Sequence, residues 1–169
     1  MANILILGAG SIGTAFSFPC SDKNNSVTII GTHLENNFID QINSKRIHPV
    51  LKCNVPKNVQ FLKFNKLSET INKKVDLIVV AVSSKGIEWA STELSKVLKI
   101  NVPIIILTKG LAIHNNNYEV LAHKMERLFN KNGIKQTNIS AVGGPCLAKG
   151  LANRVHTSVV FANSDIKIV

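Results

Sequence analysis

Acidic residues and aromatic residues are scarce in this chain of 169 residues. Ten Asp and Glu stand against twenty Lys and Arg, so the formal net charge is +10. Only one Trp and one Tyr are present, and the lysines are scattered, with no basic run beyond Lys73 and Lys74. A nucleic-acid surface built on stacking aromatics is therefore not predicted. We interpret the positive charge as favouring small anionic ligands, phosphates in particular.

Cysteines and long apolar runs are also few. The three cysteines, Cys20, Cys53 and Cys146, are odd in number and widely spaced. That spacing gives no metal-ligand pattern and indicates a reducing, cytoplasmic environment. No apolar run approaches the ~20 residues of a membrane span, and the first residues lack the basic segment of a signal peptide. With 45% hydrophobic and 18% charged residues, the sequence predicts one globular domain.

The most informative stretch is residues 4–13, ILILGAGSIG. Its continuous apolar start is typical of a strand covered on both faces in a parallel sheet. The glycines Gly8, Gly10 and Gly13 follow with the spacing G-x-G-x-x-G. In that pattern the first allows a tight turn, the second lets a pyrophosphate approach the backbone, and the third lets a helix pack closely on the strand. The pattern alone could be a ligand-free turn, but its place between strand and helix favours dinucleotide binding.

Apolar runs alternate with helical patterns along the rest of the chain. Strands are predicted at 27–30, 59–64, 76–82, 103–107, 139–142 and 155–162. Helices are predicted at 34–43, 67–72, 87–98, 118–129 and 147–152, after a short first helix that Pro19 ends. This alternation predicts the α/β class, with a Rossmann-type, doubly wound, mainly parallel sheet.

Ligands of such sheets bind beyond the carboxyl ends of the strands. Thr32 and His33 follow the second strand, where NAD-selective proteins usually carry Asp or Glu, and they either face a ribose or are ordinary loop residues. Glu35 is interpreted as the start of the next helix. Because no carboxylate would then repel a 2′-phosphate, the sequence predicts that NADPH binds at least as well as NADH.

Three later strand ends carry further candidates. Ser83 and Ser84 could cap the next helix, bind a ligand, or do both. Lys109 could present its ammonium to a phosphate or carboxylate, although an exposed loop lysine is the simpler interpretation. Cys146 ends the segment Gly-Gly-Pro-Cys at 143–146, whose glycines let the backbone approach a ligand. No acid–base partner for the thiol is evident, so we interpret Cys146 as a small residue near a pocket.

Four segments resemble the soluble, NAD(P)-dependent sn-glycerol-3-phosphate dehydrogenases. GAGSIGTA at 8–15 is similar to the family's GAGSWGTA, and VTIIGT at 27–32 is similar to its VxLWGR or VxLWGH. LTKGL at 107–111 resembles its TKGL, and VGGPCLAKGLANRVHTSVVFAN at 142–163 resembles its SGPSFAKEVAxGxPTAVVxA. The glycine loop is shared by many families, whereas the combination of the last two segments is much more specific.

The resemblance implies individual roles. Ser11 and Ile12 would lie on the cofactor pyrophosphate, Thr32 at the ribose end, and Lys109 beside both nicotinamide and substrate. The full set implied for the cofactor, NADP or NAD, is Gly8, Gly10, Ser11, Ile12, Gly13, Thr32, Ser83, Lys109 and Ala148. The set implied for the substrate, glycerol 3-phosphate or dihydroxyacetone phosphate, is Lys109, Gly144 and Cys146.

The chain also departs from the family. Ser83, Cys146, Gly150 and His156 stand where the family usually has Pro, Ser/Thr/Asn, Glu and Pro. Family members carry a second, all-helical half, which supplies the general-base lysine and would begin after Val169. The resemblance therefore implies an NAD(P)-binding Rossmann domain over residues 1–169 without the helical substrate domain. A homodimer or a partner that supplies a helical domain could complete it.

The activity implied is reversible hydride transfer between a nicotinamide cofactor and glycerol 3-phosphate or dihydroxyacetone phosphate. Two alternatives stay open. One is a non-catalytic NAD(P)-binding module, and the other is a related ketoacid or hydroxyacid reductase. The positive charge and the TKG segment favour the glycerol 3-phosphate reaction over the related reductase, whereas the missing second half favours the non-catalytic module. Neither a metal nor a nucleic-acid partner is predicted.

Overall fold

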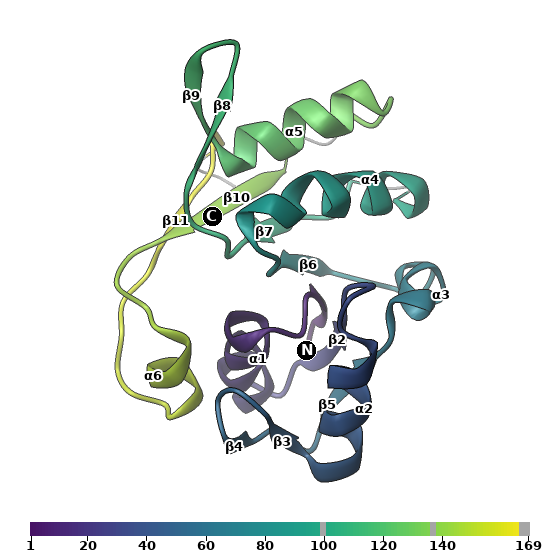
Figure 1. Ribbon diagram of the computed structural model, residues 1–169, viewed down its shortest axis with the longest axis vertical. Coiled ribbons are helices and arrows are strands. Elements are labelled where there is room, and N and C mark those ends of the chain that lie inside the picture. The colour runs from purple at the N-terminus through teal and green to yellow at the C-terminus, as the bar shows by residue number, and fades with distance from the viewer. Residues whose placement is uncertain (99–100, 136–137, 166–169) are drawn as a thin grey trace.

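A seven-stranded sheet forms the centre of the protein, in a computed structural model that describes residues 1–98, 101–135 and 138–165. The strand order is β11-β10-β7-β6-β1-β2-β5, and every neighbouring pair is parallel except β10 with β11 (Figure 1). The strands are β1 (Asn3–Leu7), β2 (Ser26–Ile30), β5 (Val59–Leu62), β6 (Leu77–Val80), β7 (Ile104–Ile106), β10 (Ile139–Gly143) and β11 (Val160–Ala162). The predicted Rossmann-type, doubly wound, mainly parallel sheet is confirmed.

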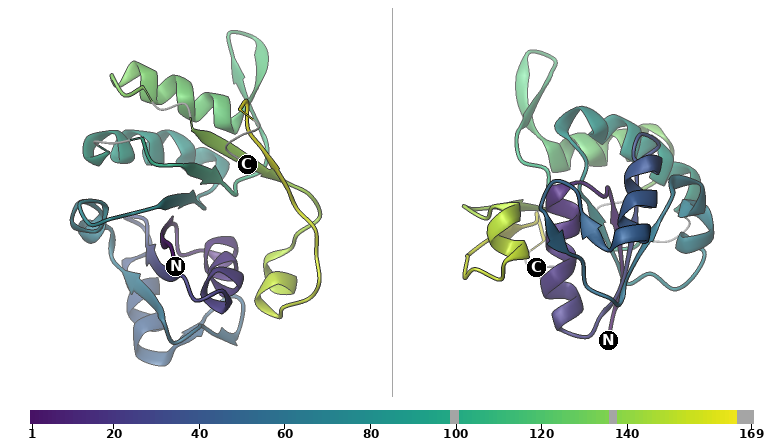
Figure 2. Two further views of the ribbon diagram at one scale, coloured as in Figure 1. Left: turned by 180° about the vertical axis from the view of Figure 1, so that it is seen from behind. Right: turned by 60° about the horizontal axis from the view of Figure 1, so that its bottom comes forward.

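Helices cover both faces of this sheet. On one face lie α1 (Ser11–Asp22) and α2 (Asn36–Lys45). On the other lie α3 (Leu67–Ile71), α4 (Ile87–Val97) and α5 (Leu121–Lys131). Figures 1 and 2 show the α4–α5 pair near one end of the molecule and α1 with α2 near the other. In the part of the chain that the structure describes, no helix combines the length and hydropathy that crossing a membrane requires.

The first strand is apolar at nearly every position because both of its faces are buried. Leu5 and Leu7 pack with the α4–α5 side, whereas Ile4 and Ile6 pack with the α2 side. A half-exposed strand would instead alternate apolar with polar residues. The prediction of a strand covered on both faces is confirmed.

The first helix is longer than predicted. Pro19 lies inside α1, which continues to Asp22, so the expectation that Pro19 ends this helix is wrong. Proline removes one backbone hydrogen bond, but the residues around it are fixed by contacts elsewhere. Phe18 is buried against the segment after β10, and the Ser21 hydroxyl donates to the Asn58 side chain at 2.6 Å. Tertiary packing therefore outweighs the local preference.

Two hairpins replace segments that the sequence left irregular or helical. The first joins β3 (Ile47–His48) to β4 (Cys53–Asn54), and the second joins β8 (Leu111–His114) to β9 (Asn117–Val120). The expectation that the helix over 118–129 begins at Tyr118 is wrong, because α5 begins at Leu121. Asn115 and Asn116 have φ of 49° and 61°, and two such residues make the tight turn that twisted hairpin strands favour.

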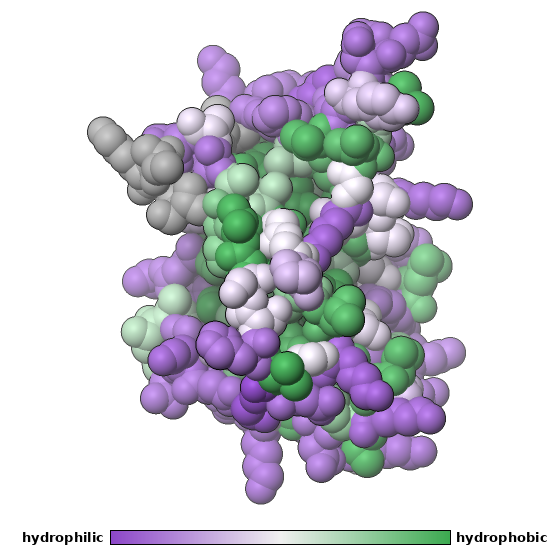
Figure 3. Space-filling view, turned by 90° about the vertical axis from the view of Figure 1, so that its left-hand side faces the viewer, coloured by the Kyte–Doolittle hydropathy of each residue, from purple (hydrophilic) through white to green (hydrophobic). Residues whose placement is uncertain are grey.

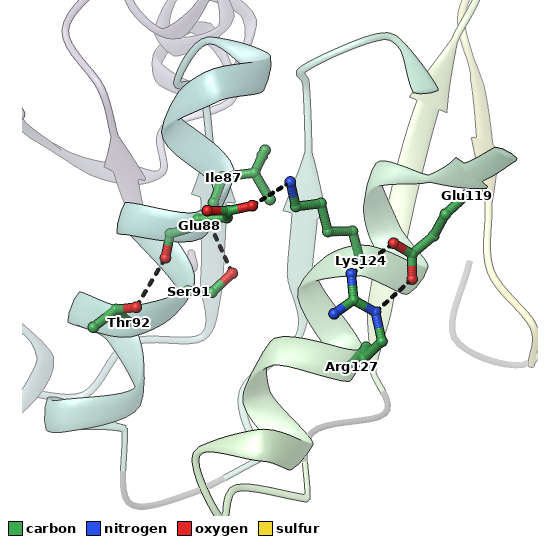
Figure 4. Close-up of polar contacts among 7 residues, drawn as sticks. All are labelled: Ile87, Glu88, Ser91, Thr92, Glu119, Lys124 and Arg127. Atoms are coloured by element: carbon green, nitrogen blue, oxygen red, sulfur yellow. Dashed lines mark hydrogen bonds and ion pairs between the residues drawn. The ribbon is translucent and has the colours of Figure 1, made fainter. Parts of the chain in front are cut away.

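One ion pair ties the second hairpin to α5, and another joins α5 to α4. Glu119 of β9 accepts two hydrogen bonds from Arg127 of α5, at 2.9 and 2.8 Å (Figure 4). Lys124 of α5 pairs in turn with Glu88 of α4 at 2.7 Å. The other face of the hairpin carries four exposed apolar side chains, which are Leu111, Ile113, Tyr118 and Val120.

The segment between β10 and β11, residues 144–159, leaves the sheet and returns, and we name it the strap. Its helix α6 (Ala148–Ala152) lies beside α1, as Figures 1 and 2 show, and Ala152 is buried there with Phe18. Arg154 donates two hydrogen bonds of 2.8 Å to Asp22. The predicted strand over 155–162 is confirmed only at 160–162, where β11 pairs antiparallel with β10.

Candidate functional site

The glycine loop, residues 8–13, joins β1 to α1 at the carboxyl edge of the sheet. Gly8 has φ +113°, and a Cβ there would lie 2.5 Å from the carbonyl oxygen of Ala81. A Cβ on Gly13 would lie 2.2 Å from the carbonyl oxygen of Gly8. A Cβ on Gly10 would meet only Oε1 of Glu35, at 3.8 Å. The outer glycines therefore allow close packing, while the middle one leaves space over the backbone.

The peptide groups on either side of Ala9 are held by three side chains from different elements. The Ala9 N–H donates to Oε2 of Glu35 at 3.1 Å, and the same oxygen accepts the Thr32 N–H at 2.7 Å. The Ala9 carbonyl accepts the Thr14 hydroxyl at 3.0 Å and lies 3.3 Å from Nε2 of His48. The start of α1, the start of α2 and the β3–β4 hairpin thus fix the glycine loop together.

The N-terminus of α1 carries no side-chain cap. Gly10 is the N-cap residue and has no side chain to accept a hydrogen bond, and Ser11 and Ile12 begin the helix. The first backbone N–H groups of a helix lack acceptors within the helix, and together with the helix dipole they attract an anion. Uncapped N–H groups and the open position at Gly10 therefore form a cradle that fits a pyrophosphate.

A first cavity of about 460 Å³ lies between the ends of β2 and β6. It brings together three residues singled out in the sequence, Gly10, Thr32 and Ser83. The start of the next helix has no side-chain cap hydrogen bond, so the interpretation of Ser83 or Ser84 as a side-chain cap is wrong.

The first cavity also contains His33, which the sequence offered beside Thr32, and Trp89, which the sequence did not reveal. His33 and Trp89 are in ring contact with centroids 4.9 Å apart, and Lys85 lines the same cavity. Glu35 does stand at the N-cap of α2, but its carboxylate folds back to the Thr32 N–H at the end of β2. The premise that no carboxylate lies at this strand end is therefore wrong.

A second cavity of about 390 Å³ lies beneath the strap and is mostly apolar. Ile12, Lys109 and Cys146 all line it. The Lys109 ammonium is exposed, but it donates to the carbonyl oxygens of Gly144 and Cys146, the second at 3.5 Å. Lys109 is therefore an exposed loop lysine, as the simpler interpretation has it, but its ammonium is held against the turn that contains Cys146.

The turn at Gly144, where the strap begins, packs closely against the end of the strap at Ser158. Gly144 has φ +110°, and a Cβ there would lie 3.0 Å from the carbonyl oxygen of Ser158. Cys20 lines the second cavity together with Cys146, and burial raises the pKa of the Cys20 thiol to about 11. A thiol that stays protonated is a poor nucleophile, so Cys20 contributes packing to this cavity.

A third cavity, of about 670 Å³, brings Ser11 of α1 to Ala148 of α6. The residues singled out in the sequence therefore fall into four groups. Three groups line cavities around the glycine loop, and Gly8 and Gly13 form the fourth, as packing positions of the loop itself. Gly144 lines none of the three cavities and joins the second group only through its carbonyl, which accepts from Lys109. Among the residues that the structure describes, no three His, Cys, Asp or Glu side chains are grouped to hold a metal ion.

Sequence reasoning missed Trp89 and His48 because their roles arise from contacts between distant segments. His48 lies 39 positions from its partner Ala9 in the chain, and Trp89 of α4 meets His33 in the turn between β2 and α2. The one local signal was that Trp89 is the single tryptophan of the chain and lies on the first turn of the helix after a buried strand.

Comparisons with known proteins agree with this geometry. Residues 3–169 match the family model described as NAD-dependent glycerol-3-phosphate dehydrogenase N-terminus. An NADP(+)-dependent glycerol-3-phosphate dehydrogenase of Archaeoglobus fulgidus is 29% identical over 95% of this chain and 46% of its own length. A glycerol-3-phosphate dehydrogenase [NAD(P)+] of Exiguobacterium is 28% identical over 99% of this chain and 47% of its own.

Solved structures show the same fold. A glycerol-3-phosphate dehydrogenase of Coxiella burnetii has a TM-score of 0.79 at 21% identity, covering 98% of this chain and 48% of that one. The Plasmodium falciparum enzyme has a TM-score of 0.80 at 22% identity, covering 98% and 46%. The chain spans about half the length of the curated relatives it matches.

Proposed function

The chain belongs to the family of NAD-dependent glycerol-3-phosphate dehydrogenases, whose N-terminal part it matches, and from this premise we propose that residues 1–169 bind NAD(P). The bound cofactor would exchange hydride with C2 of glycerol 3-phosphate or dihydroxyacetone phosphate, and the chemistry of hydride transfer is the cofactor's own. This chain would supply binding and orientation in a cytoplasmic enzyme.

The observation that carries the proposal is the cradle over Gly10. A pyrophosphate fits there because no side chain caps α1 and no Cβ occupies the space above Gly10. Ser11 and Ile12 would donate their backbone N–H groups to it. The two ends of the dinucleotide would then extend in opposite directions, into the first and the second cavity.

The first cavity suits the adenosine end. An adenine ring can stack on Trp89 or His33, which already form an aromatic pair. Thr32 and Ser83 line the same cavity and would face the ribose. Oε2 of Glu35 is engaged by two backbone N–H groups, and Lys85 brings a positive charge to the lining of the same cavity. We therefore retain the expectation that NADPH binds at least as well as NADH.

The second cavity suits the nicotinamide and the substrate. Ile12 offers an apolar contact to the ring, and Lys109 lies where its ammonium can pair with a phosphate or polarise a carbonyl. Gly144 and Cys146 would line the substrate from the turn that Lys109 already holds. Ala148 would reach the cofactor from α6, across the third cavity from Ser11.

Oxidation of a secondary alcohol also needs a base to take the hydroxyl proton as hydride leaves. Positioned acid–base catalysis contributes about 10²–10⁴-fold. We propose that this base lies in the part of the relatives that residues 1–169 do not match, supplied to the site by a helical domain or by a second subunit. Residues 1–169 alone would then bind cofactor and turn over very slowly.

Two measurements on residues 1–169 test this proposal. Titration of NADH and NADPH, followed by Trp89 fluorescence, should give saturable binding with NADPH at least as tight as NADH. Lys85→Ala should weaken NADPH more than NADH. Absence of binding by either cofactor would contradict the proposed function, and a clear preference for NADH would assign the ribose hydroxyls to Glu35.

Turnover is then measured as NADPH oxidation with dihydroxyacetone phosphate, and with a simple ketoacid as the alternative substrate. We expect cofactor binding without measurable turnover in the wild type, in Lys109→Ala and in the control Lys131→Ala. Robust turnover by the wild type that disappears only in Lys109→Ala would make Lys109 the base. Turnover with the ketoacid alone would instead support a related reductase.

A further inference from the structure

His48 occupies an unusual position for an ionisable side chain. It is fully buried in the β3–β4 hairpin, with an exposed fraction of 0%. Its Nδ1 accepts the backbone N–H groups of Val50 at 3.2 Å and Leu51 at 3.0 Å. The proton of the neutral ring is therefore on Nε2, which donates to the carbonyl of Ala9 at 3.3 Å. Phe38 packs edge-on against the ring, with centroids 4.9 Å apart.

We propose that His48 is a positioning residue for the glycine loop, and that cofactor binding requires its neutral, Nε2-protonated form. The inference rests on the proposed NAD(P) binding for its ligand, but its geometric basis lies within the protein itself. His48 would touch neither the cofactor nor the substrate, and it would act through the Ala9–Gly10 peptide.

That peptide transmits the effect because it is planar. The Ala9 carbonyl and the Gly10 N–H belong to one rigid unit, so a hydrogen bond that orients the first also orients the second. Gly10 is the N-cap of α1 and immediately precedes the N–H groups that would receive the pyrophosphate. Thr14 donates to the same carbonyl but lies on α1 itself, whereas His48 fixes the loop to a separate element.

Protonation of the ring would disrupt this arrangement. An imidazolium carries an N–H on both nitrogens, so Nδ1 would face the N–H groups of Val50 and Leu51 without a lone pair. A buried charge and two unsatisfied donors are costly. The hairpin would have to shift, and the hydrogen bond to Ala9 would be lost with it.

The charged groups around His48 do not offset this cost. Burial lowers the pKa of His48, while the Glu35 carboxylate at the start of α2 acts in the opposite direction and is outweighed. Cys53 is paired with His48 across the hairpin, and burial raises the pKa of its thiol, which stays neutral. Phe38 of α2 packs on the ring, Thr14 of α1 shares the Ala9 carbonyl with it, and neither side chain carries a charge. His48 is therefore neutral at neutral pH and becomes charged only in acid.

The test is a pH series of NADP⁺ binding to residues 1–169, with Trp89 fluorescence as the signal. We expect wild-type affinity to fall about fivefold or more between pH 7.5 and pH 4.5. His48→Gln keeps a donor near Nε2 and an acceptor near Nδ1 but does not titrate. It should bind within about threefold of the wild type at pH 7.5 and vary little with pH. His48→Leu should bind at least about tenfold more weakly at pH 7.5, and the exposed His123→Gln should match the wild type throughout.

The role of His48 would be overturned if the affinity of His48→Gln for NADP⁺ fell in acid as much as that of the wild type, or if the wild-type affinity did not change with pH. Nuclear magnetic resonance on the ligand-free protein separates this outcome from failure of the proposed function. The amide shifts of residues 9–12 should follow the titration of the His48 ring, whether or not any nucleotide binds. If no nucleotide binds at any pH, the proposed function fails. If the amide shifts of residues 9–12 also do not change as the His48 ring titrates, the inference fails as well.

Discussion

The glycine-loop region and the region formed by the strap, β11 and the β8–β9 hairpin differ sharply in how their apolar side chains are covered. In β1, the residues from Ile4 to Leu7 are at most 6% exposed. In the strap and the hairpin, Leu147 is 75% exposed and Ile113 is 73% exposed, and Val160 beside the strap is 66% exposed. Figure 3 shows the face on which these segments lie, with apolar and weakly polar side chains in its middle and strongly polar ones around them.

This difference in burial separates the end proposed for the cofactor from the end proposed for the substrate. The cofactor end is held by contacts within residues 1–98, since β1, β2 and β6 bury one another and three side chains hold Ala9. The end proposed for the substrate presents apolar side chains that the described part of the chain leaves uncovered. The comparison predicts that substitutions in the first region are costly and that matched ones in the second are nearly neutral.

The largest effect should come from truncating a strand residue in each region. Ile6 is fully buried in β1, so Ile6→Ala should lower the free energy of unfolding by about 3 kcal/mol through lost burial and a residual cavity. Val160→Ala in β11 should change it by less than about 0.5 kcal/mol. Urea denaturation of both variants checks this. A comparable loss in Val160→Ala would show that β11 is covered in solution.

A second comparison uses two glycines. Gly13→Ala would bring its Cβ to 2.2 Å from the Gly8 carbonyl, so the loop must move. We expect a loss of about 2 kcal/mol of stability from overpacking, together with loss of cofactor binding. Gly143→Ala is the matched control, since nothing lies within 4 Å of its Cβ, and it should leave both properties unchanged. Intact NADPH binding by Gly13→Ala would contradict the close-packing role of this glycine.

The same contrast explains how much the sequence could predict. The sheet followed from apolar runs such as residues 4–7, because burial on both faces leaves a signal at every position. The outer glycines followed from spacing, because close approach of two backbones can be met by glycine alone. These features are local, so a single stretch of sequence contains the whole signal.

The parts that escaped prediction depend on contacts between distant segments. Pro19 was expected to end α1, but buried neighbours on both sides hold the helix together. His48 reached the glycine loop only through the β3–β4 hairpin, and no spacing rule links it to Ala9. Glu35 was correctly placed at the start of α2, but the direction of its carboxylate depends on a bond to the Thr32 N–H.

A smaller effect is expected where the two regions are joined. Asp22 of α1 pairs with Arg154 of the strap, and both side chains are largely exposed, so Asp22→Asn should cost about 0.5 kcal/mol. The Arg154 hydrogen bonds lower the pKa of Asp22 below its usual 3.8. A lowered carboxyl pKa gives stability that is complete above pH 3.8 and is lost as the pH falls through the folded-state value.

The measurement is limited trypsin digestion, because the strap contains Lys149 and Arg154. Asp22→Asn should speed cleavage after Lys149 at pH 7. Asp40→Asn on α2, which breaks the exposed ion pair of Asp40 with Lys63, should not. Equal cleavage rates in the two variants would show that the ion pair does not hold the strap against α1.

The smallest effect on stability should come from the outer face of the β8–β9 hairpin. Ile113 lies on β8 opposite Tyr118 of β9, and both side chains are exposed. Ile113→Thr keeps a β-branched residue in the strand and removes no buried contact, so the free energy of unfolding should change by less than about 0.5 kcal/mol. It should nevertheless reduce binding of a hydrophobic fluorescent dye, because the apolar face of the hairpin shrinks. Ala112→Thr, on the opposite face toward α5, is the matched control and should destabilise without reducing dye binding. A stability loss in Ile113→Thr as large as that of Ala112→Thr would mean that the outer face of the hairpin is packed in solution. Uncovered apolar side chains would then be a property of the strap and not of the hairpin.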